Sequence, residues 1–185
     1  MVGEPAGHRR LVEAVAAVYE WIAAQQIREP HRAGQCNACG ACCDFPAYGH
    51  RLYVTTPELI YLTAKLNVLS PAGGGWATNP EISLKNTGPI CLFPSHRLLP
   101  MPAGRCPYQQ DNRCAIHEHR FAGCRIFTCR GDPDFQSELS EAALKRFKTL
   151  CEESQIPYRY QDLPTALNDG TCRSAGAPCP GDCGG

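Results

Sequence analysis

Four cysteines within an eight-residue stretch constrain this chain more than any other feature of its sequence. They are Cys36, Cys39, Cys42 and Cys43. So short a segment carries almost no apolar surface of its own, and therefore it cannot bury four thiols as hydrophobic filler. Cysteine thiolates are strong metal ligands, and a shared metal is the simplest reason to keep them together. The sequence therefore predicts a metal site, around which the rest of the chain must fold.

The cysteine count favours metal binding over disulfide bonding. The 185 residues include 13 cysteines, and an odd number cannot pair completely within one chain. Disulfide-rich secreted domains are usually shorter than about 80 residues and follow a secretory signal. Residues 1–30 carry charges throughout and contain no such signal, and no segment reaches the roughly 18 apolar residues of a membrane span. We therefore expect a cytoplasmic protein with reduced cysteines and no membrane partner.

Length and charge set further bounds on the chain. A length of 185 residues suits one domain with short additions. The 18 basic and 18 acidic residues balance, so no overall field favours nucleic acid or an anionic membrane. We expect an amphipathic helix within residues 1–30, a cysteine-cluster metal-binding domain over 31–165, and a flexible Gly/Pro/Cys tail over 166–185.

Apolar side chains at helical spacing predict a helix over residues 8–28, and Pro30 ends it. This helix either braces the metal-binding half of the chain or docks a protein partner, and bracing is the commoner use of such a stripe. A short strand is expected at residues 51–54. Thr56 follows as the N-cap of a helix that runs to about Leu66, with a proline and an acid in its first turn.

The second half of the chain is expected to be irregular apart from one long helix. Glycines and prolines over residues 70–80 predict an exposed connection. The long helix begins at Asp134 or Ser137, ends near residue 155, and carries Cys151 on its apolar side as a buried, inert thiol. These elements predict the α+β class: a small, irregular, metal-stapled domain with few short strands, flanked by N- and C-terminal helices.

A second group of cysteines occupies residues 106–129. Its members are Cys106, Cys114, Cys124 and Cys129, separated by seven, nine and four residues. Residues 109–112 are typical turn formers, so Cys106 and Cys114 are expected to face each other across a hairpin. The two groups together supply eight candidate metal ligands.

The spacing leaves the metal open between zinc and iron. The first group follows the C-x2-C-x2-C pattern of iron–sulfur clusters, and Cys106-Pro107 matches the remote ligand of that class. Zinc sites more often use two separate C-x2-C pairs, which the second group lacks, although eight thiolates can also hold two zinc ions. Adjacent Cys42 and Cys43 are expected to point in different directions. They would then reach different metals, or one of them would stay outside the ligand set.

Positive charge surrounds the second cysteine group. Five arginines lie between residues 105 and 130, against two acids, Asp111 and Glu118. The arginines are Arg105, Arg113, Arg120, Arg125 and Arg130. Four thiolates around a dication keep a net negative charge, which buried sites balance with nearby donors, so we expect the arginines to supply that balance. The alternative is that these arginines form a solvated basic face with no role at the metal. Nucleic acid is disfavoured because the aromatic interleaving of single-strand binders is missing.

Taken as a set, the cysteine motifs resemble the CxxCxxCC family of YkgJ-type cysteine-cluster proteins, described as zinc- or iron-chelating domains. The matching motifs are Cys36-x2-Cys39-Gly40-x-Cys42-Cys43, Cys106-Pro107, Cys114-Ala115-Ile116, Arg120, Cys124-Arg125-Ile126-Phe127 and Cys129. The resemblance covers about residues 34–130. It implies a small metal-chelating domain in which the eight cysteines are the ligands, and it implies no general enzymatic activity.

Two positions depart from the family pattern. His117 stands where the family usually has an aromatic residue, and Phe121 where it usually has proline. His117 and His119 therefore become candidate nitrogen ligands, although histidines beside a cysteine cluster more often lie outside the ligand set. Cys91 is not assigned to the site.

Three further cysteines lie in the tail. They are Cys172, Cys179 and Cys183. Flexible cysteines beside a chelating domain could deliver or accept metal. A disordered tail with ordinary thiols is the simpler expectation, because the segment has no apolar pattern.

These observations predict a metal-binding protein that holds zinc or iron, or an iron–sulfur cluster, through eight cysteines. Two alternatives stay open: a redox or catalytic iron–sulfur protein, and a structural zinc module that docks a protein partner. No nucleotide-binding loop, catalytic triad or helically spaced carboxylate pair accompanies the cysteines in the sequence. No catalytic residue is therefore assigned, and an enzyme is the less favoured interpretation.

Overall fold

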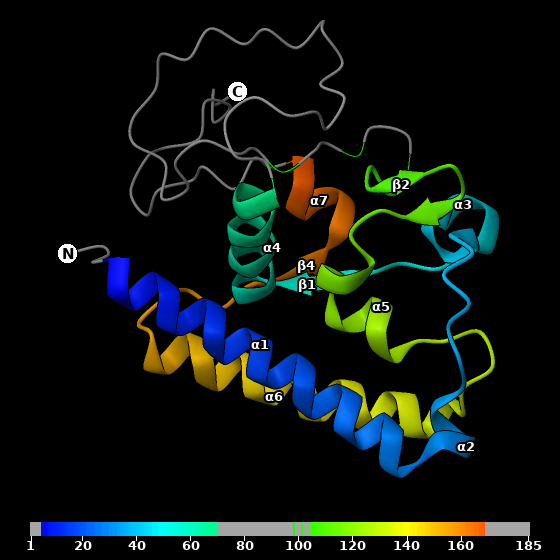
Figure 1. The fold of residues 1–185 in the computed structure, drawn as a ribbon, viewed down its shortest axis with the longest axis horizontal. Helices are drawn as coiled ribbons and strands as arrows, with labels where there is room; N and C mark the ends of the chain where they lie inside the picture. The colour runs from blue at the N-terminus through cyan, green and yellow to red at the C-terminus, as the bar shows by residue number, and fades with distance from the viewer. Residues whose placement is uncertain (1–4, 70–97, 99–100, 102–103, 169–185) are drawn as a thin grey trace, which may run out of the picture.

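The computed structural model describes residues 5–69, 98, 101 and 104–168. The predicted connection at 70–80, Cys91, the three tail cysteines and most of the predicted flexible tail lie outside these residues. The described chain is α+β, as predicted: helices flank an irregular centre that carries a few short antiparallel strands (Figure 1). Among the described residues, no helix is both long enough and apolar enough to cross a membrane.

Helices make up most of the described chain. The α-helices are α1 (Pro5–Arg28), α2 (Pro30–Ala33), α3 (Phe45–Tyr48), α4 (Thr56–Leu69), α5 (Ala122–Ile126), α6 (Pro133–Glu153) and α7 (Leu163–Asn168). Two 3-10 turns, η1 (Ala41–Cys43) and η2 (His117–His119), lie in the cysteine-rich segments. The strands are β1 (Tyr53–Thr55), β2 (Gln109–Gln110), β3 (Arg113–Cys114) and β4 (Tyr160–Asp162).

The three long helices lie where the sequence predicts them, with shifted ends. α4 begins at Thr56, so its N-cap position is Thr55 rather than the predicted Thr56. α6 begins earlier than predicted because Asp132 caps it: its carboxylate accepts the backbone N–H of Phe135 at 2.7 Å. A capping side chain outside the apolar pattern therefore sets this end of the helix.

The larger hydrophobic core lies where α1, α4 and α6 meet, with α1 and α6 running side by side in Figure 1. Tyr19 of α1 packs edge to face on both Tyr61 and Phe147, with ring centroids 5.1 and 6.1 Å apart. Cys151 is buried in α6, as predicted. α1 is therefore part of this core, the bracing role that its apolar stripe predicts.

A second hydrophobic core supports the cysteine-rich segments. It includes Val54, Leu62 and Phe121, and α7 adds Ala166 and Leu167. Three predicted ligands pack against it as partly buried side chains: Cys106, Cys114 and Cys124. The thiols of the second group therefore rest on a packed apolar surface, which limits their movement.

Each of the two small sheets in the described chain is an antiparallel pair. β1 pairs with β4, with Val54 opposite Gln161. β2 and β3 form the predicted hairpin, with Gln109 opposite Cys114. Its two turn residues, Asp111 and Asn112, both have positive φ angles (47° and 59°), the pattern of a type I′ turn, which suits the twist of a tight hairpin.

The buried carboxylate of Glu58 joins four elements. One oxygen accepts the backbone N–H and the hydroxyl of Thr55, at 2.9 and 2.8 Å. The other accepts the backbone N–H of Ala122 at 2.7 Å and the hydroxyl of Tyr19 at 3.4 Å. The bond back to Thr55 is half of a capping box for α4, and the bond to Ala122 caps α5 from a distance. Glu58 therefore ties α1, β1 and α4 to the helix that carries Cys124.

Candidate metal centre

The first cysteine loop begins against the segment that carries Cys129. Thr128 donates a side-chain hydrogen bond to the carbonyl of Ala33 at 2.7 Å. Gly34 follows with a φ of 67°, and a Cβ atom there would lie only 2.6 Å from the backbone nitrogen of Gly131. Only glycine permits this close approach in a left-handed conformation. The start of the loop is therefore held beside residues 128–131.

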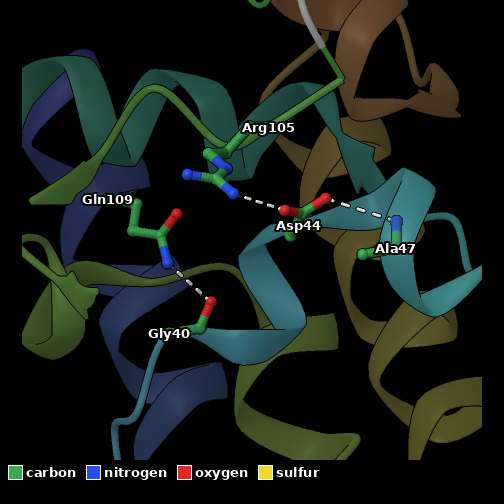
Figure 2. A network of polar contacts seen from close by, with 5 residues as sticks. All are labelled: Gly40, Asp44, Ala47, Arg105 and Gln109. Atoms are coloured by element: carbon green, nitrogen blue, oxygen red, sulfur yellow. Dashed lines mark hydrogen bonds and ion pairs between the residues drawn. The ribbon is translucent and has the colours of Figure 1, made fainter.

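The end of the same loop is held against the β2–β3 hairpin. The Gln109 side-chain amide donates to the carbonyl of Gly40 at 2.8 Å, and the backbone N–H of Cys106 donates to the carbonyl of Cys43 at 2.8 Å. Next to it, Arg105 pairs with Asp44, whose other carboxylate oxygen accepts the backbone N–H of Ala47 (Figure 2). Both ends of the loop are thus attached to the segment that carries the second cysteine group.

Replacing Gly40 with alanine is expected to destabilise this attachment. Gly40 has a φ of 71°, and an added Cβ would lie 2.3 Å from the carbonyl oxygen of Asn112. We expect a loss of about 2–3 kcal/mol in unfolding free energy, with weaker metal binding. Gly49→Ala is the matched control, because Gly49 has a φ of 62° with no atom within 4 Å of its Cβ position. It should cost only about 1–2 kcal/mol, measured by urea unfolding. Equal losses in the two variants would contradict the close packing at Gly40.

The structure brings six of the eight predicted ligands within electrostatic reach of one another. The pKa of Cys43 responds to the thiols of Cys106, Cys42 and Cys114. In the same way, the pKa of Cys124 responds to Cys114, Cys42 and Cys43, and that of Cys114 to Cys42 and Cys36. The group therefore combines thiols from the first loop, the hairpin and α5.

The other two predicted ligands, Cys39 and Cys129, lie outside the described contacts of this group. Both are exposed. Cys39 directly precedes Gly40, which lies against the hairpin, and Cys129 follows Thr128, which bonds to the start of the loop. Each is therefore next to an attachment point of the loop.

Cys42 is exposed and Cys43 is buried, so the two neighbouring side chains lie in different surroundings. The Cys43 thiol is still close enough to be the largest cause of the raised pKa of Cys42. The reason is local: Gly40 turns the chain with a positive φ, and residues 41–43 then form the 3-10 turn η1. That Cys42 and Cys43 bind different metals, or that one of them stays outside the ligand set, remains a prediction.

Burial and the neighbouring thiols oppose ionisation of the buried thiols, although the charge of Arg120 lowers the pKa of Cys124. A hydrogen bond with Cys106, followed by burial, raises the pKa of Cys43 to about 12. Burial, followed by the charge of Cys114, raises the pKa of Cys124. A cation among them would reverse this effect, because it stabilises the thiolate form of each ligand.

Arginines contact the thiol group and its supporting backbone. Arg120 Nη1 donates to Cys36 Sγ at 3.3 Å and lies 2.6 Å from His117 Nε2. Arg125 donates to the backbone carbonyls of Arg120, at 2.8 Å, and Glu118, while its guanidinium covers the ring of Tyr19 at 4.2 Å. Of the five predicted neutralising arginines, Arg120 is the one with a described hydrogen bond to a thiol, and Arg125 fixes the turn that carries it.

The residues present fit a thiophilic metal by their chemistry. Sulfur donors with an imidazole nitrogen are the ligand types that zinc and iron take in proteins. Three buried side-chain atoms have no hydrogen-bond partner among the described residues: Gln109 Oε1, His119 Nδ1 and Arg120 Nε, and Arg120 also contacts Cys36. In the described part of the chain, no three His, Cys, Asp or Glu side chains are arranged closely enough to hold a metal as they stand.

Sequence reasoning missed the side chains that hold the loop in place. Asp44 and Gln109 are polar residues without a local motif, and their partners lie 61 and 69 residues away in the sequence. No periodic or spacing signal predicts such distant pairs, although the positive φ at Gly40 agrees with the glycine expected in a metal-binding loop.

Comparison of the chain with family models, with curated proteins and with solved structures finds no match. The resemblance to the CxxCxxCC family therefore stays a prediction.

Proposed function

We propose that this protein binds metal, zinc or iron, through its cysteine cluster. The observation that carries this proposal is the contact between the two cysteine groups: the backbone N–H of Cys106 donates to the carbonyl of Cys43 at 2.8 Å, and the thiols of Cys42 and Cys106 both shift the pKa of Cys43. Hydrophobic packing does not require sulfur atoms from distant segments to gather around one residue, whereas a metal centre does.

Two further observations support the proposal. All nine described cysteines are unpaired, the state in which thiols bind metal in a reducing cytoplasm. The loop that carries Cys36 to Cys43 is already fixed at both ends, so the ordering cost of metal binding is reduced.

Eight side chains would hold the metal. They are Cys36, Cys39, Cys42, Cys43, Cys106, Cys114, Cys124 and Cys129. When bound, the metal supplies the positive charge that keeps these thiolates ionised, and it cross-links the loop to the second cysteine group. Arg120 Nη1 donates to Cys36 Sγ, which places positive charge beside the ligand set.

The test is anaerobic purification of the full chain, followed by analysis of zinc, iron and acid-labile sulfide and by a visible spectrum. Brown protein with iron and sulfide indicates an iron–sulfur cluster, and colourless protein with about one or two zinc ions per chain indicates zinc thiolate sites. Protein that binds neither metal at a stoichiometric level, even after anaerobic reconstitution, would refute the proposal.

A further inference from the structure

One nitrogen atom of Arg120 bridges a sulfur and an imidazole nitrogen. Arg120 Nη1 lies 3.3 Å from Cys36 Sγ and 2.6 Å from His117 Nε2, and these two acceptor atoms are 4.0 Å apart. Arginine has only donors, so His117 must accept through the lone pair of Nε2, and its ring proton lies on Nδ1. The lone pairs of Cys36 Sγ and His117 Nε2 therefore point at the same cationic atom.

We propose that His117 Nε2 is a ligand of the same metal as Cys36, in the place that Arg120 Nη1 holds. This inference rests on the proposed function and adds a nitrogen donor to the cysteine centre. A hydrated metal ion would exchange two water ligands for Cys36 Sγ and His117 Nε2, the two Arg120 hydrogen bonds would be lost, and the thiol proton of Cys36 would pass to solvent.

The separation of the two donor atoms suits one metal. Zinc–sulfur bonds of about 2.3 Å and zinc–nitrogen bonds of about 2.0 Å at a tetrahedral angle place the donors about 3.5 Å apart. The observed 4.0 Å needs only a small movement of either side chain. Cys114, whose pKa responds to the charge of Cys36, is a candidate for a further sulfur ligand.

Arg120 is suited to give up this position. Its Nε is buried without a hydrogen-bond partner among the described residues, so its guanidinium is incompletely satisfied where it lies. The backbone beneath it is fixed independently, because Arg125 donates to the carbonyls of Glu118 and Arg120. The Arg120 side chain can therefore rotate away while the turn that carries His117 keeps its place.

His119 provides a matched control two residues away. It lies in the same 3-10 turn and, like His117, is half-buried. Its ring, however, packs against Tyr61 of α4, with centroids 6.2 Å apart. If His117 is a ligand, replacing His117 should weaken metal binding much more than replacing His119.

The experiment measures Co²⁺ binding to the metal-free full chain under anaerobic conditions, by visible absorption, for the wild type and three variants. His117→Ala should weaken binding at least about tenfold and remove one nitrogen ligand from the spectrum, whereas His119→Ala should stay within about twofold of the wild type. His117→Cys should restore binding and move the cobalt d–d bands to longer wavelength, because sulfur replaces nitrogen.

The outcomes separate the two proposals. Wild-type chain that binds no Co²⁺ would overturn the metal-binding function together with this inference. If the wild type binds Co²⁺, and His117→Ala and His117→Cys bind it with the same affinity and the same spectrum, only the ligand role of His117 is overturned. Equal weakening by His117→Ala and His119→Ala, with no spectral change in His117→Cys, would also overturn it, because that result reports only the stability of the turn.

Discussion

Replacing Cys43 with serine is expected to weaken metal binding by about a hundredfold or more and to destabilise the cysteine-rich half of the chain. Cys43 is buried, its carbonyl accepts the backbone N–H of Cys106, and the thiols of Cys42 and Cys106 both shift its pKa. A serine hydroxyl keeps the shape but does not ionise to a strong ligand for zinc or iron at neutral pH. Because metal binding and folding are coupled in small metal-binding domains, stability should fall with affinity.

Cys151→Ser is the control for this change. Cys151 is buried in α6, with 1% of its surface exposed against 9% for Cys43. Its replacement should cost about 1–2 kcal/mol of stability and leave the bound metal per chain unchanged. Metal analysis of both variants after anaerobic purification, with urea unfolding, checks the pair. Full metal content in Cys43→Ser would contradict the placement of Cys43 at the centre of the site.

Replacing Glu58 with alanine is expected to lower the unfolding free energy by about 3 kcal/mol or more. The change leaves two backbone N–H groups, of Thr55 and Ala122, and two hydroxyl groups without their acceptor, and each unsatisfied buried donor costs about 1–3 kcal/mol. Glu138→Ala, at an exposed position of α6, should stay within about 0.5 kcal/mol of the wild type. Urea unfolding measures both, and similar values for the two variants would show that water replaces the missing carboxylate.

The pH dependence of Glu58→Gln gives a second measurement at this residue. Burial raises the pKa of Glu58 above its ordinary value of 4.5, so the folded state holds the proton more tightly than the unfolded state. The contribution of Glu58 to stability is therefore complete below pH 4.5 and is lost as pH rises through the folded pKa. Glutamine does not titrate, so the stability of the wild type relative to Glu58→Gln should decrease as pH rises. Both proteins keep the same cysteines, so effects of pH on metal binding cancel in this difference. An increase with pH would show that hydrogen bonds to the carboxylate outweigh its burial.

The helices and the hairpin could be predicted from the sequence because their signals are local. The apolar stripe of α1 repeats within the helix, and the turn formers at 109–112 adjoin the two strands that they connect. The starts of α4 and α6 were shifted because capping depends on single polar side chains: Glu58 accepts the backbone N–H of Thr55, and Asp132 accepts that of Phe135.

By itself, the sequence determined the chemistry of the candidate site: which thiols are available, in which two groups, and with how much positive charge nearby. Only the tertiary structure decided that Cys106 lies against Cys43, that Gly40 fits against the hairpin, and that Arg120 lies between Cys36 and His117. The physical reason is distance along the chain. Cys36 and Arg120 are 84 residues apart, and their contact depends on how two separate cores pack rather than on any local pattern.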